Sequence, residues 1–193
     1  PKIIIKNLIS LPTGTKVFNW LSTLLGTLYI IIISSYMIFI MIFLIMFTLG
    51  GSTGVILGNA VVDVSLHDTY YIIAHFHFVL SLGAIIALFL GILFYQDILF
   101  ASYSFIPNSS SKNAKFHCYL SYFGINLTFT PMHFLGFNSQ PRRIPDFPDY
   151  FNSWNILSSI GSGLTIFAFY LFYAYDYKLF KNLSTHLNSF KIP

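Results

Sequence analysis

The chain has 193 residues, of which 55% are hydrophobic, 19% aromatic and only 8% charged. A soluble domain typically has about 25% charged residues, so this composition excludes an ordinary soluble domain and favours a protein of the lipid bilayer. The net charge is +4 and the basic residues form no stripe, so we expect no nucleic-acid partner. Cys118 is the single cysteine, which excludes a disulfide within the chain.

Five stretches are long and apolar enough to predict bilayer-spanning helices, each of which needs about 20 apolar residues. The first contains Lys16 and the pair Pro12 and Gly14, so we expect it to be weak and kinked. The second has an uncharged core, YIIIISSYMIFIMIFLIMFTL, followed by small residues that allow close helix packing. We therefore predict an all-α membrane protein without a soluble domain. The expected spans are residues 3–24, 29–61, 70–95, 115–137 and 153–175.

Segments separated by an even number of expected crossings share a side of the membrane, and their charges predict which side that is. Residues 96–114 and the tail after Tyr175 lie on one side and carry Lys112, Lys178, Lys181 and Lys191, so we expect that side to be the matrix or cytoplasm. The turn at 62–69 and the loop at 138–152 lie on the opposite side. Their polar residues can therefore meet.

The stretch HDTYYIIAHFHF places His75 and His77 inside the third expected span. Helix positions i and i+2 point about 200° apart, so the two imidazoles cannot easily hold one ion, and two cofactors are expected, with Phe76 between them. Imidazole is a suitable axial ligand of haem iron, and an apolar macrocycle suits a helix bundle. The alternative is two buried histidines hydrogen-bonded to neighbouring helices, and the spacing alone does not name haem.

His67 and Asp68 stand at the membrane edge, where the third span begins. An imidazole and a carboxylate there could hold a hydrated divalent cation. The alternative is that Asp68 caps the helix N-terminus, and these two residues alone favour the cap.

Arg142 and Arg143 lie in the proline-rich loop QPRRIPDFPDY. Adjacent guanidinium groups bind carboxylates well, and the propionates of a haem are carboxylates. The alternative is an interfacial anchor, or salt bridges to Asp146 and Asp149.

Lys16 lies in the first span with Thr13, Thr15 and Ser22 nearby. A lysine with hydroxyls inside a membrane bundle can mark a proton path. It can also extend to the nearer interface, and the residues alone favour this second interpretation.

Most of residues 12–165 resemble subunit I of the haem–copper oxidases, especially the mitochondrial cytochrome c oxidases. The resemblance lies in GGSTGVILGNAVVDVSLHDTYYIIAHFHFVLSLGA, INLTFTPMHFLGFNSQPRRIPDFPDY, WNILSSIGS and PTGTKVFNWLSTL. The motifs HDTYY…AHFH and PRR are highly specific in combination. The resemblance implies that the five spans match the eighth to twelfth helices of a twelve-helix subunit.

The resemblance also implies roles for the residues of the third span. His75 would ligate the iron of haem a3, the oxygen-binding haem. His77 would be one of two axial ligands of haem a, and Phe76 would lie between the two haems.

Further roles follow from the same resemblance at the membrane edge. His67 and Asp68 match the family's magnesium site, so the resemblance favours an ion site over a helix cap at these residues. Asp63 matches an acidic residue near the haem propionates, and Arg142 and Arg143 match the pair that binds the propionates of both haems.

Thr13 and Lys16 match the family's lysine proton path, which reverses the preference for a lysine at the interface.

The copper-binding histidines, the cross-linked tyrosine and the second ligand of haem a are missing from the sequence. His117, His133 and His186 match none of the copper ligands. We therefore expect a naturally split subunit that needs an N-terminal partner fragment to hold the copper. The alternative is that the sequence is a piece of a longer subunit.

The implied function is reduction of oxygen to water coupled to proton translocation, in the mitochondrial inner membrane with the C-terminus in the matrix. The implied partners are that N-terminal fragment, subunit II with its electron-accepting copper site, subunit III, accessory subunits and cytochrome c as donor. The alternatives are a quinol oxidase of the same family and a non-catalytic membrane scaffold derived from it.

Overall fold

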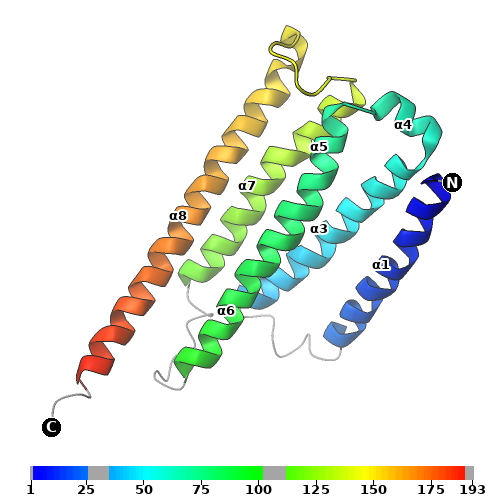
Figure 1. Cartoon of the computed structure of the whole chain (residues 1–193). Coiled ribbons are helices and arrows are strands. Elements are labelled where there is room, and N and C mark those ends of the chain that lie inside the picture. Colours follow the sequence, from blue (N-terminus) through cyan, green and yellow to red (C-terminus); the bar gives the residue numbers. More distant parts are fainter. Residues whose placement is uncertain (1, 26–34, 102–111, 190–193) are drawn as a thin grey trace.

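The computed structural model describes residues 2–25, 35–101 and 112–189 (Figure 1). Every regular element in this part of the chain is helical, and strand pairing is limited to one antiparallel bridge between Thr69 and Pro141. The elements are α1 (Lys2–Leu25), α3 (Ser35–Gly58), α4 (Ala60–Leu66), α5 (Tyr70–His77), the π-helical η1 (Phe78–Ile85), α6 (Ile86–Ala101), α7 (Lys112–Phe137), the 3-10 turn η3 (Asp149–Phe151) and α8 (Asn152–Ser189).

The long helices lie side by side as rods, with α5, η1 and α6 joined into one of them (Figure 1). α1 packs against α3, and α7 packs along α8. The apolar core forms where α3, the η1–α6 segment and α7 meet. Its most buried side chains include Phe39, Leu82, Ile86, Cys118 and Ile125.

Three helical stretches in the described residues are long and apolar enough to cross a bilayer. They are Ser35–Gly58, Tyr70–Tyr95 and Asp149–Tyr175. Many large apolar side chains also face outward, among them Ile166, which is 69% exposed, as expected where lipid rather than water surrounds the helices. The chain is an all-α membrane protein, and bilayer crossing by α1 and α7 stays a prediction.

The second predicted span, 29–61, is too long at its C-terminal end. α3 ends at Gly58, and the side chain of Asn59 then accepts a hydrogen bond from the backbone N–H of Val61 at 3.3 Å. An asparagine cap of this kind starts a new helix, so α4 is separate. Residues 29–34 lie outside the described part of the chain.

The third and fifth predicted spans end where the apolar helical stretches end, at Tyr95 and Tyr175, although the helices themselves continue to Ala101 and Ser189. Loss of apolar character marks where a helix leaves the hydrocarbon, but it does not end the helix. α1 continues through Pro12 as one helix, and the expected kink there stays a prediction.

Gly136 lets the end of α7 touch the beginning of α5. A Cβ atom at this glycine would overlap the backbone nitrogen, Cα and Cβ of Tyr71. This close approach places the loop after α7 directly beside the turn before α5, and it therefore positions the polar cluster described next.

Candidate functional site

The turn before α5 and the loop after α7 are joined through their backbones. Arg142 N–H donates to Asp68 O at 2.9 Å, and Tyr70 N–H donates to Gln140 O at 3.1 Å. Gln140 is only 1% exposed and Thr69 only 5%, so the part of the junction that these two residues form is buried. The prediction that these two polar segments can meet is confirmed.

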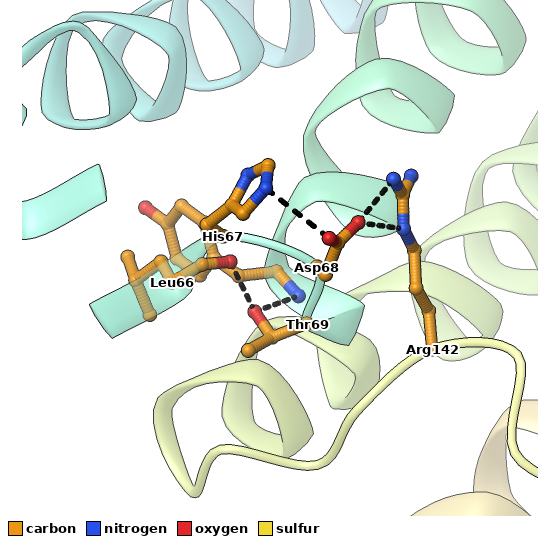
Figure 2. A network of polar contacts seen from close by, with 6 residues as sticks. Leu66, His67, Asp68, Thr69 and Arg142 are labelled. Carbon is orange, nitrogen blue, oxygen red and sulfur yellow. Dashed lines mark hydrogen bonds and ion pairs between the residues drawn. The ribbon is translucent and has the colours of Figure 1, made fainter. Parts of the chain in front are cut away.

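Asp68 lies between two partners at this junction (Figure 2). Arg142 Nε–H donates to Asp68 Oδ1 at 2.8 Å, and a second guanidinium nitrogen contacts the same oxygen. His67 Nε2 lies 3.1 Å from Asp68 Oδ2. The hydrogen bond from Arg142, followed by the positive charges nearby, holds the pKa of the Asp68 carboxyl below its usual value, although partial desolvation opposes this.

The helix cap is Thr69, so the interpretation of Asp68 as the cap is wrong. Thr69 has extended backbone angles, and its hydroxyl accepts from Tyr71 N–H at 3.3 Å while donating to Leu66 O at 2.7 Å. Asp68 instead adopts a left-handed φ of 57°. That conformation turns its carboxylate toward Arg142, away from the helix end.

His67 and Asp68 supply at most two ligands for a cation. Among the described residues, no group of three or more His, Cys, Asp or Glu side chains could hold a metal ion. The two side chains are 68% and 55% exposed, which leaves room for water. Mg²⁺ usually keeps several waters and few protein ligands, so the pair fits a hydrated ion with further ligands from elsewhere.

The two arginines differ in their surroundings. Arg142 pairs with Asp68, and the salt bridges to Asp146 and Asp149 that were the alternative are not formed. Arg143 has a left-handed φ of 63°, and within the described residues it makes no ion pair. Its guanidinium is therefore open to an anionic group.

His75 faces α3. Its Nδ1 atom lies 2.9 Å from Thr53 Oγ1 and 3.0 Å from Gly50 O. Gly54 makes space for the ring, because a Cβ at this glycine would lie 2.8 Å from His75 Cε1. The imidazole is half-buried, and its Nε2 atom makes no hydrogen bond to the described residues.

His77 faces α7 instead. Its Nδ1 atom lies 2.9 Å from Ile73 O, and its ring stacks on Phe129 with centroids 4.6 Å apart and planes 11° apart. The ring of Phe76 lies 4.3 Å from the His77 ring and is 37% exposed. The helical spacing correctly predicted that the two imidazoles have different neighbours.

A cavity of about 960 Å³ lies between α1, α3 and α5. His75, His67 and Asp63 line it together with Thr13 from α1, and the rest of the lining is mostly apolar. A planar apolar macrocycle with carboxylate substituents fits this lining. Lys16 lies on the same helix as Thr13, where its Nζ atom is 6.0 Å from the centroid of the Trp20 ring.

Two further histidines lie in α7, of which His117 is buried and His133 half-buried. His117 Nε2 lies 3.1 Å from Ser121 Oγ, and His133 Nδ1 lies 3.1 Å from Phe129 O. The second nitrogen of each ring is buried without a hydrogen-bond partner in the described residues. The resemblance excluded them only as copper ligands, although histidines in an apolar membrane helix are rare and usually functional.

The comparisons with known proteins agree on one family. The model of the family "Cytochrome C and Quinol oxidase polypeptide I" matches residues 3–164. The chain belongs to this family. Its similar relatives include cytochrome c oxidase subunit 1 of Plasmodium chabaudi, 54% identical over 86% of this chain and 34% of the relative. The same subunit of Eremothecium gossypii is 42% identical over 94% of this chain and 33% of the relative, and that of Pecten maximus is 45% identical over 86% and 33%.

The chain therefore spans about a third of the length of the oxidase relatives it matches. The family assignment covers both sides of the Asp68–Arg142 junction and both histidines of α5, since the matched residues run from 3 to 164.

Proposed function

We propose that this chain forms the haem-binding part of a cytochrome c oxidase subunit I. His75 ligates the iron of haem a3, and His77 supplies one axial ligand to haem a. When bound, the two haems and a copper ion held outside this chain would carry electrons to oxygen and reduce it to water. The subunit couples this reaction to proton translocation.

The main support is the arrangement of the two imidazoles of α5. Each Nδ1 atom lies about 3 Å from a backbone carbonyl, Gly50 O for His75 and Ile73 O for His77. A carbonyl only accepts hydrogen bonds, so each Nδ1 carries the proton and each Nε2 keeps a free lone pair. Histidines that ligate metals usually donate their other ring N–H in this way. The two lone pairs lie on sides of α5 that face different helices.

The polar residues at the membrane edge would hold the periphery of the haems. Arg143 is open to a propionate, and Arg142 can share its guanidinium between Asp68 and a second carboxylate. Asp63 lines the same cavity as His75, where it can accept a hydrogen bond from a protonated propionate. His67 and Asp68 would hold a hydrated magnesium ion beside them.

Thr13 and Lys16 would deliver protons toward the cavity. Thr13 lines it, and its hydroxyl donates to Ile9 O at 3.2 Å, so the oxygen can still accept from water. Lys16 is exposed one turn further along α1. Its ammonium group can exchange protons with water that reaches Thr13.

The partners in this proposal are the remaining part of subunit I, whether separate or covalently continuous, subunits II and III, accessory subunits and cytochrome c. The location is the mitochondrial inner membrane with the C-terminus in the matrix. A quinol donor is the second possibility, because the family model covers both donors. Oxidation rates of purified complex with reduced cytochrome c and with a quinol distinguish the two.

Optical spectra of the purified complex test the ligand assignment. His75→Ala should abolish the haem a3 band and oxygen reduction while leaving haem a, and His77→Ala should perturb the haem a band. His133→Gln is the matched control, since it removes a half-buried imidazole for which no role is proposed. If both α5 variants keep both haem bands, the ligands lie elsewhere and the chain is a scaffold without haem contacts.

A further inference from the structure

A three-residue cluster on α3 surrounds the imidazole of His75. Thr53 Oγ1 and Gly50 O both lie within 3.0 Å of Nδ1, and Gly54 faces the edge of the ring. The Thr53 hydroxyl also donates to Gly50 O at 2.6 Å. These atoms therefore form a closed set in which the imidazole, the hydroxyl and the carbonyl contact one another.

The proton positions in this cluster follow from the carbonyl. Gly50 O can only accept, so the protons on Thr53 Oγ1 and on His75 Nδ1 are the ones directed at it. The Thr53 hydroxyl has a single proton, which the 2.6 Å bond to Gly50 O uses. Its oxygen is then an acceptor for His75 Nδ1–H at 2.9 Å. The imidazole N–H is shared between two acceptors on one helix.

Two neighbouring hydroxyls on α3, those of Thr48 and Ser52, bond within the helix instead. Thr48 bonds to Leu44 O and Ile45 O, and Ser52 bonds to Leu49 O, all within their own helix. Such bonds within a helix are common for Thr and Ser and need no function. Thr53 makes the same kind of bond to Gly50 O, but its hydroxyl also contacts the His75 side chain of α5, 22 positions further along the sequence.

We infer that Thr53 is a positioning residue that fixes the rotation and the tautomer of the His75 ring and increases the basicity of its Nε2 atom. The inference rests on the proposed haem ligation by His75. Two acceptors at Nδ1 define the ring plane, whereas one acceptor would allow the ring to rotate about a single contact. Sharing the Nδ1 proton with oxygen acceptors makes the opposite nitrogen a stronger electron donor.

The test uses the assembled oxidase complex that contains this chain. Resonance Raman spectra of the reduced, ligand-free complex report the iron–histidine stretching band of a five-coordinate haem. Thr53→Val and Thr53→Ala remove the acceptor and should shift this band to lower frequency and broaden it. Loss of such an outer contact typically weakens binding about 10- to 100-fold, so haem a3 should also dissociate more readily in detergent. Thr53→Ser keeps the hydroxyl and should retain the wild-type band.

Thr165→Val is the matched control, because its hydroxyl bonds only to Gly161 O and Ser162 O of α8. It should leave the band unchanged. A wild-type band in both hydroxyl-free variants overturns the role of Thr53, and so does a shifted band in Thr53→Ser. The band should be lost in His75→Ala whether or not the Thr53 variants respond. This result tests the proposed haem ligation separately from the role of Thr53.

Discussion

The guanidinium of Arg142 binds the carboxylate of Asp68 through Nε at 2.8 Å, across 74 positions of the sequence. The contact joins the start of α5, which carries both candidate haem ligands, to the loop that follows α7. It is reinforced by the backbone bond from Arg142 N–H to Asp68 O. The membrane-edge residues and the histidines of α5 are therefore parts of one connected structure.

Asp68→Asn should make the complex less stable at neutral pH, and the stability of the variant should change less as the pH falls. The pKa of Asp68 is lowered from 3.8, first by the hydrogen bond from Arg142. A carboxyl group whose pKa is lowered by folding stabilises the folded state at pH values above its ordinary pKa. This contribution is lost as the pH falls through the folded-state pKa. The difference in melting temperature between wild type and Asp68→Asn should therefore be largest at pH 7 and decrease below about pH 4. Asp149→Asn is the control, and an equal difference at both pH values would contradict the prediction.

Gly54→Ala should displace the His75 ring. The added methyl group would lie 2.8 Å from Cε1 of that ring, which is closer than real Cβ contacts allow. We expect the haem a3 band to decrease while the haem a band persists, as measured by optical spectra of the purified complex. Gly91→Ala is the matched control, because a Cβ there meets nothing within 4 Å. Equal spectra for the two variants would show that the ring has freedom to move.

Lys16→Met and Thr13→Val should slow proton uptake. Removal of a positioned proton carrier typically costs about 10²- to 10⁴-fold, and we expect turnover to fall by at least the lower figure in Lys16→Met. The measurement is oxygen consumption with reduced cytochrome c, together with pH changes in reconstituted vesicles. Lys112→Met removes a lysine at the start of α7 and should have no effect. Normal turnover in Lys16→Met would mean that this lysine only extends to the membrane interface.

Manganese should replace magnesium at His67 and Asp68. Complex produced with excess Mn²⁺ should show a bound Mn²⁺ signal in electron paramagnetic resonance, and His67→Ala and Asp68→Ala should lose it. Because His67 and Asp68 supply at most two ligands, the bound ion should also show strong coupling to exchangeable water protons. Asp146→Ala is the control, because this carboxylate accepts from Phe147 N–H, and it should keep the signal. A signal that survives both ligand variants would place the ion elsewhere.

Several features of this protein were predictable because they depend on local chain geometry. The scarcity of charge and the length of the apolar runs indicated a helical membrane protein. Two positions on a helix diverge in a known way, so the spacing of His75 and His77 was enough to predict different neighbours. The number of expected crossings between the segments of Asp68 and Arg142 predicted that they can meet, and their contact confirms this.

Other features appeared only with the assembled helices, because they depend on which side chains the packing brings together. Thr69 rather than Asp68 caps α5, since the left-handed backbone of Asp68 turns its carboxylate toward Arg142. Asn59 divides a run that looked like one span. The contact of Thr53 with His75 has no sequence signal, because helix periodicity describes which face a residue occupies but not which residue of another helix lies opposite. That pairing is determined by the close approach of α3 and α5, where Gly54 leaves space for the imidazole.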